Sequence, residues 1–294
     1  MTKELREALS GAITGATGRP FTLTALQRKS GGCINEAYVA GDGHRSYFIK
    51  LNSAEARGMF EAEAAALGAI AATKTIRVPT AVCCGAVGRH SYLVLEALPL
   101  GRPKPDGWAR MGRGLARLHR TTEAAFGWQR DNTIGTTPQT NSWTEDWPDF
   151  FREQRLRPQF ELADRQGVPV ERSAELLGQV DRLLSGHRPA ASLVHGDLWS
   201  GNADFLEDGT PVLYDPASYY GDRETDLAFS EFFGGFPQAF YQAYGEEWPL
   251  DAGYARRKKL YNLYHVLNHA NLFGGGYAAQ AQSIIDGLLG SGES

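Results

Sequence analysis

Two short apolar runs, each ending in polar residues, constrain this chain more than any other feature. The first run leads into His195, Gly196 and Asp197, and Asn202 follows in the same polar stretch. The second run ends at Asp215. Short apolar runs bounded by turn residues are typical of buried strands. We therefore expect a carboxylate, an amide and a second carboxylate to be carried at the ends of two strands.

This layout is that of a kinase catalytic loop and its metal site. Phosphoryl transfer asks a protein mainly to position the reactants and to stabilise charge on the phosphoryl oxygens. We predict that Asp197 is the base that orients the acceptor hydroxyl and accepts its proton. Asn202 and Asp215 are predicted Mg²⁺ ligands, and Asp215 would bridge the metal to the β- and γ-phosphates. His195 is expected to brace the loop. A turn, a cap or an ordinary strand end would explain any one element alone, but not all of them in this order.

A lysine strand and an amphipathic helix upstream are predicted to complete the phosphate site. The strand-like run around Lys50 resembles the kinase strand whose lysine holds the α- and β-phosphates. The helix expected over about 54–72 carries Glu63 on its apolar stripe, whereas Glu61 points away. An inward carboxylate needs a partner, because an unpaired buried charge is costly. We therefore predict a Lys50–Glu63 ion pair that orients the nucleotide. The stripe consists of Phe60, Leu67 and Ile70.

Two further segments are candidates for contacts with the nucleotide. Gly31 and Gly32 interrupt two strand-like stretches, where glycines would let backbone N–H groups close over the phosphates. The pattern is neither GxGxxG nor a Walker A loop, and a simple hairpin turn is compatible with it as well. Further along, an apolar run ends at Glu96 to Leu98. We predict this end to be the hinge, where backbone groups at Glu96 and Leu98 read the adenine.

Several motifs together resemble one kinase family. HGDLWSGN combined with YDPA and FGGF resembles the fructosamine kinase family, also called the ketosamine-3-kinases, and the match runs over about residues 20–277. HGDxxxxN alone would also fit aminoglycoside and choline phosphotransferases. The other matching segments are SGGCINEAY, the Lys50 strand, MFEAE, NTIGTTPQ and YDPASYYGDRETDLA.

The resemblance implies an α+β, two-lobed protein-kinase-like fold, with a small lobe of antiparallel sheet plus helix and a larger, mostly helical lobe. It implies ATP and Mg²⁺ as cofactors and phosphorylation of O3 of a ketosamine, the rearranged adduct of a sugar with an amine. Phosphorylation there makes the adduct prone to elimination, so such enzymes repair glycated amines by deglycation. Among bacterial members we expect ribulosamines and erythrulosamines to be better substrates than fructosamines. The glycated amine could be a free amino acid, a peptide or a protein lysine.

The resemblance also gives expected roles to three more residues. Trp199 either forms an apolar wall for the sugar or the amine-bearing side chain, or anchors the loop on the core. His269 lies on a helix expected over about 255–273 that should pass behind the acceptor site, which makes it a candidate substrate contact. A histidine on such a helix is more often a packing residue. Asp226, on a helix expected over about 223–233, should hydrogen-bond the backbone of the catalytic loop.

Composition agrees with a soluble enzyme that is long enough for two lobes, and we expect it to be cytoplasmic. With 294 residues, 42% of them hydrophobic, the chain can bury a sizeable core. We expect a nucleotide-binding lobe over 1–98 and a catalytic and substrate-binding lobe over 99–294. No stretch approaches about 18 apolar residues, the first residues are charged, and the net charge of −4 does not favour nucleic-acid binding. We expect no nucleic-acid or membrane partner, and a monomer or a weak dimer.

Cys33 lies in the predicted phosphate loop, where backbone donors and Lys50 would favour its thiolate. Two interpretations stay open: a redox-sensitive thiol, or a small buried turn residue, which is the commoner case. Cys83 and Cys84 are adjacent and form neither a disulfide framework nor a zinc pattern with Cys33.

Two other functions also stay open on the sequence. The first is a kinase of the same fold that acts on an aminoglycoside or a choline-like alcohol. Polycationic aminoglycosides need an acidic patch, which Asp222, Glu224 and Asp226 could supply, although helix positions two apart do not share a face. The second is a catalytically silent nucleotide-binding module. Such a module need not keep a base and metal ligands together, as this chain does at Asp197 and Asp215.

Overall fold

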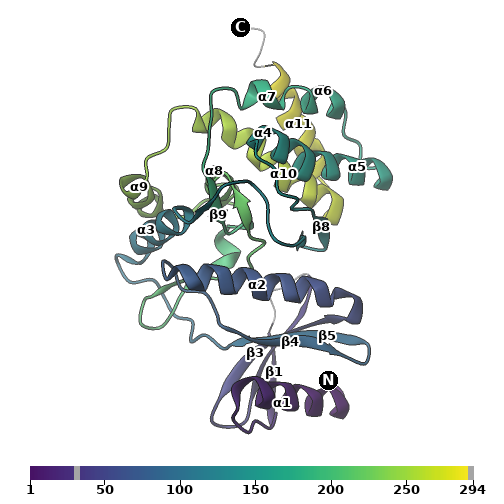
Figure 1. Ribbon diagram of the computed structural model, residues 1–294, viewed down its shortest axis with the longest axis vertical. Coiled ribbons are helices and arrows are strands. Elements are labelled where there is room, and N and C mark those ends of the chain that lie inside the picture. Colours follow the sequence, from purple (N-terminus) through teal and green to yellow (C-terminus); the bar gives the residue numbers. More distant parts are fainter. Residues whose placement is uncertain (30–33, 291–294) are drawn as a thin grey trace. The chain divides into compact units, whose positions relative to one another are not determined.

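The computed structural model describes residues 1–29 and 34–290. The chain forms two compact units (Figure 1). The sheet unit comprises Met1–Gly107 and Asp204–Asp215, and the helical unit comprises Trp108–Ala203 and Pro216–Ser294. The units differ from the predicted lobes because residues 99–107 and 204–215 make their contacts within the sheet unit. A contact-based division of this kind depends on distant packing, which sequence position does not reveal.

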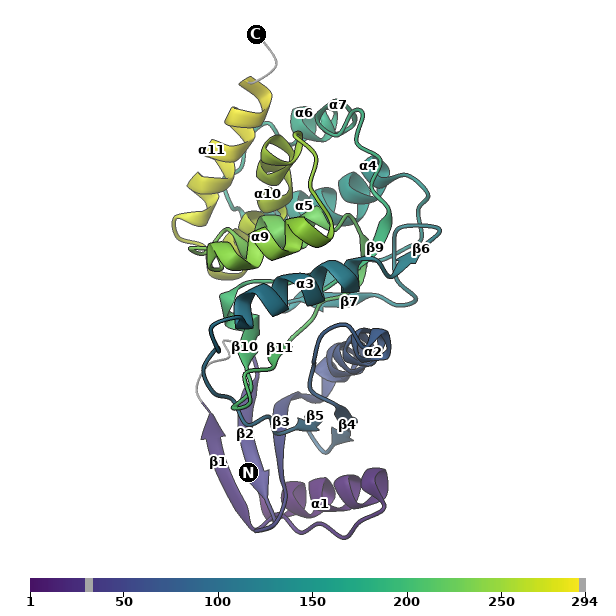
Figure 2. The ribbon, with the colours of Figure 1, turned by 90° about the vertical axis from the view of Figure 1, so that its left-hand side faces the viewer.

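The sheet unit is built on a five-stranded antiparallel sheet with strand order β1-β2-β3-β5-β4. One helix precedes the sheet, and a second lies between β3 and β4 after a 3₁₀ turn at Ala54–Ala56. Figure 2 shows these two helices on opposite faces of the sheet. The elements are α1 (Lys3–Thr17), β1 (Ala25–Lys29), β2 (Glu36–Gly41), β3 (Ser46–Ser53), α2 (Arg57–Thr73), β4 (Ala81–Val87) and β5 (His90–Glu96).

The alternation of side chains along β3 explains how each face of the sheet packs against one helix. Side chains of a strand point to its two faces in turn. Ile49 and Leu51 belong to the apolar core that α1 covers with Leu5 and Leu9. Lys50, between them, therefore points to the opposite face, which α2 covers.

A short hairpin from the second half of the chain completes the sheet unit. Its strands are β10 (Ala203–Phe205) and β11 (Pro211–Leu213). The hairpin is fixed by the Gly101 N–H, which donates to the Phe205 carbonyl at 2.8 Å, and by a parallel bridge between Arg77 and Val212. A Cβ at Gly101 would lie 2.7 Å from the Glu207 Cα, so only glycine permits this approach. The hairpin thereby carries Asp215 into the sheet unit.

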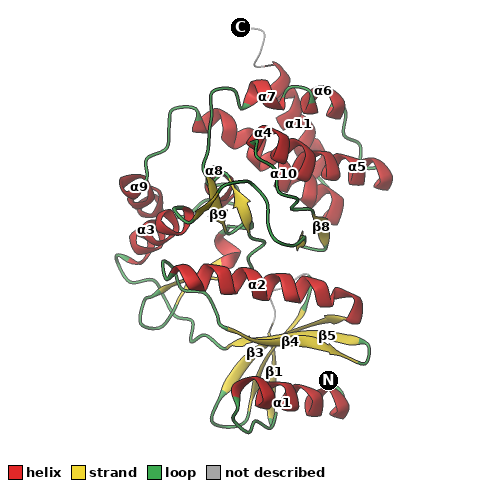
Figure 3. Cartoon of the chain, in the orientation of Figure 1, coloured by secondary structure: helices red, strands yellow, loops and turns green. Residues whose placement is uncertain are grey.

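The helical unit contains a three-stranded antiparallel sheet of order β12-β9-β6 and a two-stranded hairpin of β7 and β8. Figure 3 shows β9 and β8 among the helices of this unit. Its strands are β6 (Thr122–Glu123), β7 (Asn132–Ile134), β8 (Thr137–Gln139), β9 (Ala191–Val194) and β12 (Tyr219–Gly221). Its helices are α3 (Gly107–His119), α4 (Trp147–Phe150), a π-helix η2 (Phe151–Leu156), α5 (Arg157–Gln166), α6 (Ser173–Leu177), α7 (Val180–Leu183), α8 (Glu224–Ser230), α9 (Gln238–Glu247), α10 (Tyr254–Phe273) and α11 (Tyr277–Gly290).

The observed elements follow most of the sequence expectations. α2 and α10 match the predicted helices, while the loop expected over 127–142 contains the β7–β8 hairpin. α8 ends at Ser230, earlier than expected, and Gly234 turns the chain with a φ of 88°. α3 keeps a glycine in its middle for a reason of packing. A Cβ at Gly112 would meet the Phe240 carbonyl oxygen at 2.2 Å, so the glycine lets α3 approach α9. None of the described helices is both long enough and apolar enough to cross a membrane.

Candidate active site

In the sheet unit, Lys50 binds two carboxylates. Its Nζ lies 2.6 Å from Glu63 Oε1 on α2 and 2.7 Å from Asp215 Oδ1 at the end of the β10–β11 hairpin. The predicted Lys50–Glu63 pair is therefore present. Lys50 and Glu63 are nearly buried, whereas 47% of the Asp215 side chain is exposed. Burial by itself would lower the pKa of Lys50, but the charges of Asp215 and Glu63 outweigh it and hold that pKa above its usual value. The ammonium is thus fixed and charged where it could meet an anionic ligand.

The backbone of Asp215 adopts an unusual conformation. Its φ is 58°, in the left-handed region that few residues other than glycine, asparagine and aspartate tolerate. Non-glycine residues in this region gather at functional sites. An exposed carboxylate on such a turn, beside a fixed ammonium, is an oxygen donor of the type that Mg²⁺ takes.

In the helical unit, β9 delivers the predicted catalytic loop. Asn202 is buried, and its Nδ2 donates to both the backbone carbonyl of Asp197 at 2.8 Å and Asp197 Oδ2 at 2.9 Å. His195 is fully buried, and its Nδ1 accepts from the Asp197 N–H at 3.2 Å. The histidine therefore braces the loop, as predicted. With Nδ2 directed to Asp197, the remaining polar atom of Asn202 is Oδ1, again an oxygen suited to a hard cation.

The carboxylate of Asp226 binds the backbone of this loop. Its two carboxylate oxygens accept the N–H of His195 at 2.6 Å and that of Gly196 at 2.8 Å, which confirms the contact expected of it. His119 Nε2 lies 3.0 Å from the same carboxylate. Burial by itself raises the pKa of Asp226, but the hydrogen bond and charge of His119 outweigh it and keep that pKa below its usual value. The carboxylate thus remains an acceptor for the loop.

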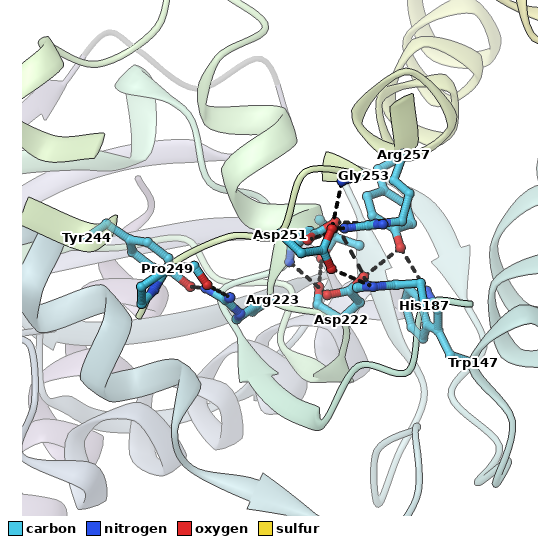
Figure 4. Close-up of polar contacts among 12 residues, drawn as sticks. Trp147, His187, Asp222, Arg223, Tyr244, Pro249, Asp251, Gly253 and Arg257 are labelled. Atoms are coloured by element: carbon cyan, nitrogen blue, oxygen red, sulfur yellow. Dashed lines mark hydrogen bonds and ion pairs between the residues drawn. The ribbon is translucent and has the colours of Figure 1, made fainter. Parts of the chain in front are cut away.

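A buried ion-pair network fixes the start of α8, the helix that carries Asp226 (Figure 4). Arg257 on α10 donates twice to Glu224, at 2.7 Å each, and once to Asp251.

A histidine and two aromatic residues complete the network around Asp222. His187 Nε2 lies 2.7 Å from Asp222 Oδ2, with Glu224 and Asp251 also close. The hydroxyl of Tyr261 donates to Asp222, and Trp147 donates to that hydroxyl.

This network corrects one idea from the sequence. Asp222, Glu224 and Asp226 were considered as an acidic patch for a polycation, but at most 1% of each residue is exposed. Each carboxylate is committed to an internal partner. A polycation in solvent would meet none of them.

The network predicts a pH dependence of stability. Burial by itself lowers the pKa of His187, but its hydrogen bond to Asp222 and the charges of Asp222 and Glu224 raise it above its usual 6.5. Because the pKa of His187 is higher in the folded protein than in the unfolded chain, protonation of His187 stabilises the fold. This stabilisation is fully present below about pH 6.5, and it is lost as the pH rises through the pKa of His187 in the folded protein. We expect the melting temperature of His187→Gln to fall less than that of the wild type between about pH 6 and pH 8.

Differential scanning calorimetry across this pH range checks the prediction. His44→Gln, at an exposed histidine, is the matched control and should keep the wild-type slope. Identical slopes for His187→Gln and the wild type would show that folding does not change the pKa of His187.

The remaining predicted nucleotide contacts are only partly described. Gly31, Gly32 and Cys33 lie outside the described residues. Glu96 ends β5, where its carboxylate accepts from the Arg77 guanidinium and its N–H donates to the Thr80 carbonyl at 2.9 Å. The Leu98 carbonyl accepts from the Leu100 N–H at 3.0 Å. These contacts hold the segment in place, and its contact with adenine stays a prediction.

Trp199 and His269, the predicted acceptor residues, share one aromatic neighbour. The Trp199 ring meets Phe233 edge-on at 5.7 Å, and Phe233 lies 5.3 Å from the His269 ring. The Tyr277 ring lies 5.1 Å from the His269 ring. Phe233 is 37% exposed, so this cluster reaches the surface of the helical unit. His269 Nδ1 lies 2.7 Å from the His265 carbonyl and must be its donor, which leaves Nε2 as an acceptor.

Comparison with known proteins decides the family. A model of the fructosamine kinase family matches residues 5–291. The chain belongs to this family. The resemblance drawn from the HGDLWSGN, YDPA and FGGF motifs is thereby confirmed, and the protein is a kinase.

Proteins similar in sequence and in structure support the same family assignment. A "probable ketoamine kinase" from Synechocystis is 53% identical over 284 residues, 96% of each chain. A chloroplastic protein-ribulosamine 3-kinase from Arabidopsis thaliana is 41% identical over 278 residues, which cover 92% of this chain and 85% of that protein. The crystal structure of a Haemophilus somnus protein assigned as a fructosamine-3-kinase has a TM-score of 0.91 at 32% identity, over 96% of each chain.

The fold extends to more distant kinases. An aminoglycoside phosphotransferase has a TM-score of 0.65 at 18% identity, covering 98% of this chain and 99% of that one. At this identity the likeness concerns the fold alone. It confirms the predicted α+β, two-lobed protein-kinase-like fold of the kinase.

Sequence reasoning missed some of the residues that support the site. His119, which contacts Asp226, follows Leu115 by one helical turn on the buried face of α3. A polar residue on an otherwise apolar stripe is a signal that could have found it. The contact between Lys50 and Asp215 had no local signal, because it joins residues far apart in the chain.

Proposed function

We propose that this kinase transfers the γ-phosphate of ATP to O3 of a ketosamine. The observation that carries the proposal is the Asp197–Asn202 geometry of the catalytic loop, in a chain whose relatives are named ketoamine and ribulosamine kinases. The phosphorylated adduct would then lose inorganic phosphate by spontaneous elimination, and water would hydrolyse the resulting imine to release the amine and a deoxy-dicarbonyl sugar, which is a deglycation.

The proposed chemistry assigns one role to each group. Asp197 accepts the proton of the O3 hydroxyl as O3 bonds to the γ-phosphorus and the bond from phosphorus to the bridging oxygen of ADP breaks. Lys50, oriented by Glu63, binds the α- and β-phosphates. The side-chain oxygens of Asn202 and of Asp215 are each of the type that Mg²⁺ takes, and each residue is proposed as a ligand. When bound, the ion neutralises charge on the phosphates.

The aromatic cluster supports an acceptor that carries an amine. Trp199 follows Asp197 closely in the same loop, and its ring packs with Phe233. Burial lowers the pKa of His269, so the ring is neutral near pH 7 and Nε2 can accept a hydrogen bond. Aromatic faces attract cations such as the ammonium of a ketosamine. We therefore propose that Trp199 and His269 contact the acceptor.

Replacement of Trp199 separates this role from that of a core anchor. A Cβ at Gly201 would lie 2.3 Å from the Trp199 ring, so the ring also packs on its own loop. We expect Trp199→Ala to raise the KM for the ketosamine about tenfold, with the KM for ATP unchanged. Trp143→Ala, at a tryptophan that is 51% exposed, is the matched control. A fall in kcat without a change in either KM would favour the anchor instead.

The function is tested by ATP- and Mg²⁺-dependent phosphorylation of ribulose-lysine, erythrulose-lysine and fructose-lysine adducts, with kanamycin and choline in parallel. We expect turnover on the ketosamines, best on the ribulosamine and erythrulosamine. Turnover on kanamycin or choline alone would overturn the proposal. So would phosphorylation of the ketosamine at a hydroxyl other than O3, located by ³¹P–¹H correlation NMR.

A further inference from the structure

Arg155 is a buried arginine that has no carboxylate partner among the described residues. It is fully buried, and it donates to the Thr140 carbonyl at 2.7 Å and to Asn141 Oδ1 at 2.7 Å. Its guanidinium also lies 4.0 Å from the centre of the Tyr219 ring. Arg257, the other arginine buried in the described part of the chain, pairs with two carboxylates. Burying a charge without an opposite charge is costly, which points to a role of Arg155 beyond packing.

The local helix is irregular where Arg155 lies. α4, η2 and α5 follow one another directly, and η2 is a π-helix in which the Arg157 N–H donates to the Arg152 carbonyl, five residues back. π-turns are rare and are found frequently at functional sites.

Arg155 organises a network of buried amides. Asn141, which it contacts, donates through Nδ2 to Asn132 Oδ1 at 3.0 Å. Gln139 donates to the same Asn132 oxygen at 2.7 Å. The Tyr264 hydroxyl donates to Gln139 Oε1 at 2.6 Å. Asn132 and Gln139 both belong to the β7–β8 hairpin, so Arg155 holds this hairpin indirectly, through its contact with Asn141.

The network ends on the segment that follows Asp215. Asn132 Nδ2 donates to the Ser218 carbonyl at 2.9 Å, and Gln139 Nε2 donates to the Ala217 carbonyl at 3.2 Å. The Ala217 N–H in turn donates to the His195 carbonyl at 2.9 Å. A Cβ at Gly196 would meet the Ala217 oxygen at 2.2 Å, so this segment lies directly against the catalytic loop.

We infer that Arg155 is a positioning residue for the phosphoryl transfer. Through Asn141, Asn132 and Gln139 it fixes the carbonyls of Ala217 and Ser218, and through them the loop that presents Asp197. The inference rests on the proposed function, since its catalytic consequence is a change in that reaction. Displacements of about 1 Å at a reacting group can cost about 10²-fold in rate.

Two variants of Arg155 test the inference that this residue positions the catalytic loop. Arg155→Met removes every donor of the guanidinium, and Arg155→Lys keeps the charge but cannot reach Thr140 and Asn141 with one planar fork. We expect Arg155→Met to lower kcat about 10- to 10²-fold, with the KM for ATP nearly unchanged and with partial recovery in Arg155→Lys. Arg157→Met is the matched control, because it removes the same charge from a partly exposed arginine close by.

Hydrogen–deuterium exchange of the wild type and variants supplies a readout that does not depend on the acceptor. In Arg155→Met we expect faster exchange in peptides over 130–142, 194–198 and 216–219, and no change over α1. Unchanged exchange in these peptides would overturn the inference even if kcat falls. A loss of kcat that only follows the fraction of unfolded protein would overturn it as well.

Should Arg155→Met not fold, Gln139→Met replaces it, because this variant removes the contacts to Asn132, Ala217 and Tyr264 while nearly conserving the volume of the side chain. The same exchange pattern over 194–198 and 216–219 is then expected, and its absence would contradict the inference. Absence of wild-type turnover on ketosamines would instead count against the proposed function, while the exchange data would still decide the positioning.

Discussion

Asp197→Ala is expected to lower kcat on a ketosamine by about 10²-fold or more, because general bases typically contribute 10²- to 10⁴-fold. The KM for ATP should change little, since the proposed partner of Asp197 is the acceptor hydroxyl and not the nucleotide. The substitution also removes the acceptor of one Asn202 hydrogen bond, but the other one, to the Asp197 backbone carbonyl, remains. The loop should therefore keep its shape. Steady-state kinetics with each substrate varied in turn gives the two constants.

Asp197→Asn refines this experiment, because it keeps the size of the side chain and removes only the basic oxygen. Both variants should lose kcat to a similar extent. Turnover near the wild-type level in either one would show that Asp197 is not the base. A large rise in the KM for ATP with kcat preserved would place Asp197 at the nucleotide instead.

The parts of the site that depend on local pattern could be predicted from the sequence. Lys50 and Glu63 are an example, because an inward carboxylate on an apolar helix stripe requires a partner, and a strand lysine was close in sequence. The bracing by His195 and the contact of Asp226 with the loop were likewise expected and are present. The position of Glu63 on its helix carried the information for the ion pair, whereas the contact of Asp226 was expected from the resemblance to the kinase family.

Contacts that join distant segments could not be predicted in this way. Nothing near Arg155 indicates that it contacts Asn141, because the contact depends on a π-turn inside a helix. The β10–β11 hairpin packs with residues before Gly107 through single backbone contacts, and hydrophobic periodicity does not report such contacts. The acidic residues at the start of α8 were weighed as a surface patch, although burial and ion pairing decide their role.

The second large effect is expected at Asp215. Asp215→Asn should weaken binding of Mg·ATP and lower turnover together, because it removes a carboxylate that is predicted to bind both the metal and, through it, the phosphates. Asparagine is the informative replacement, since it tolerates the left-handed backbone at a φ of 58°, whereas alanine would add backbone strain to the loss of charge. The free protein also loses one of the two carboxylates that hold Lys50, so the ammonium then depends on Glu63 alone.

Titration calorimetry with ATP, with and without Mg²⁺, separates the metal role of Asp215 from a purely structural one. We expect Mg²⁺ to strengthen ATP binding in the wild type and much less in Asp215→Asn, with kcat lowered by about 10²-fold or more. Asp208→Asn is the control, because it makes the same change of charge in the same hairpin, at a residue that is exposed. If Asp215→Asn instead weakened only the binding of the ketosamine, the carboxylate would belong to the acceptor, and the metal would need another ligand.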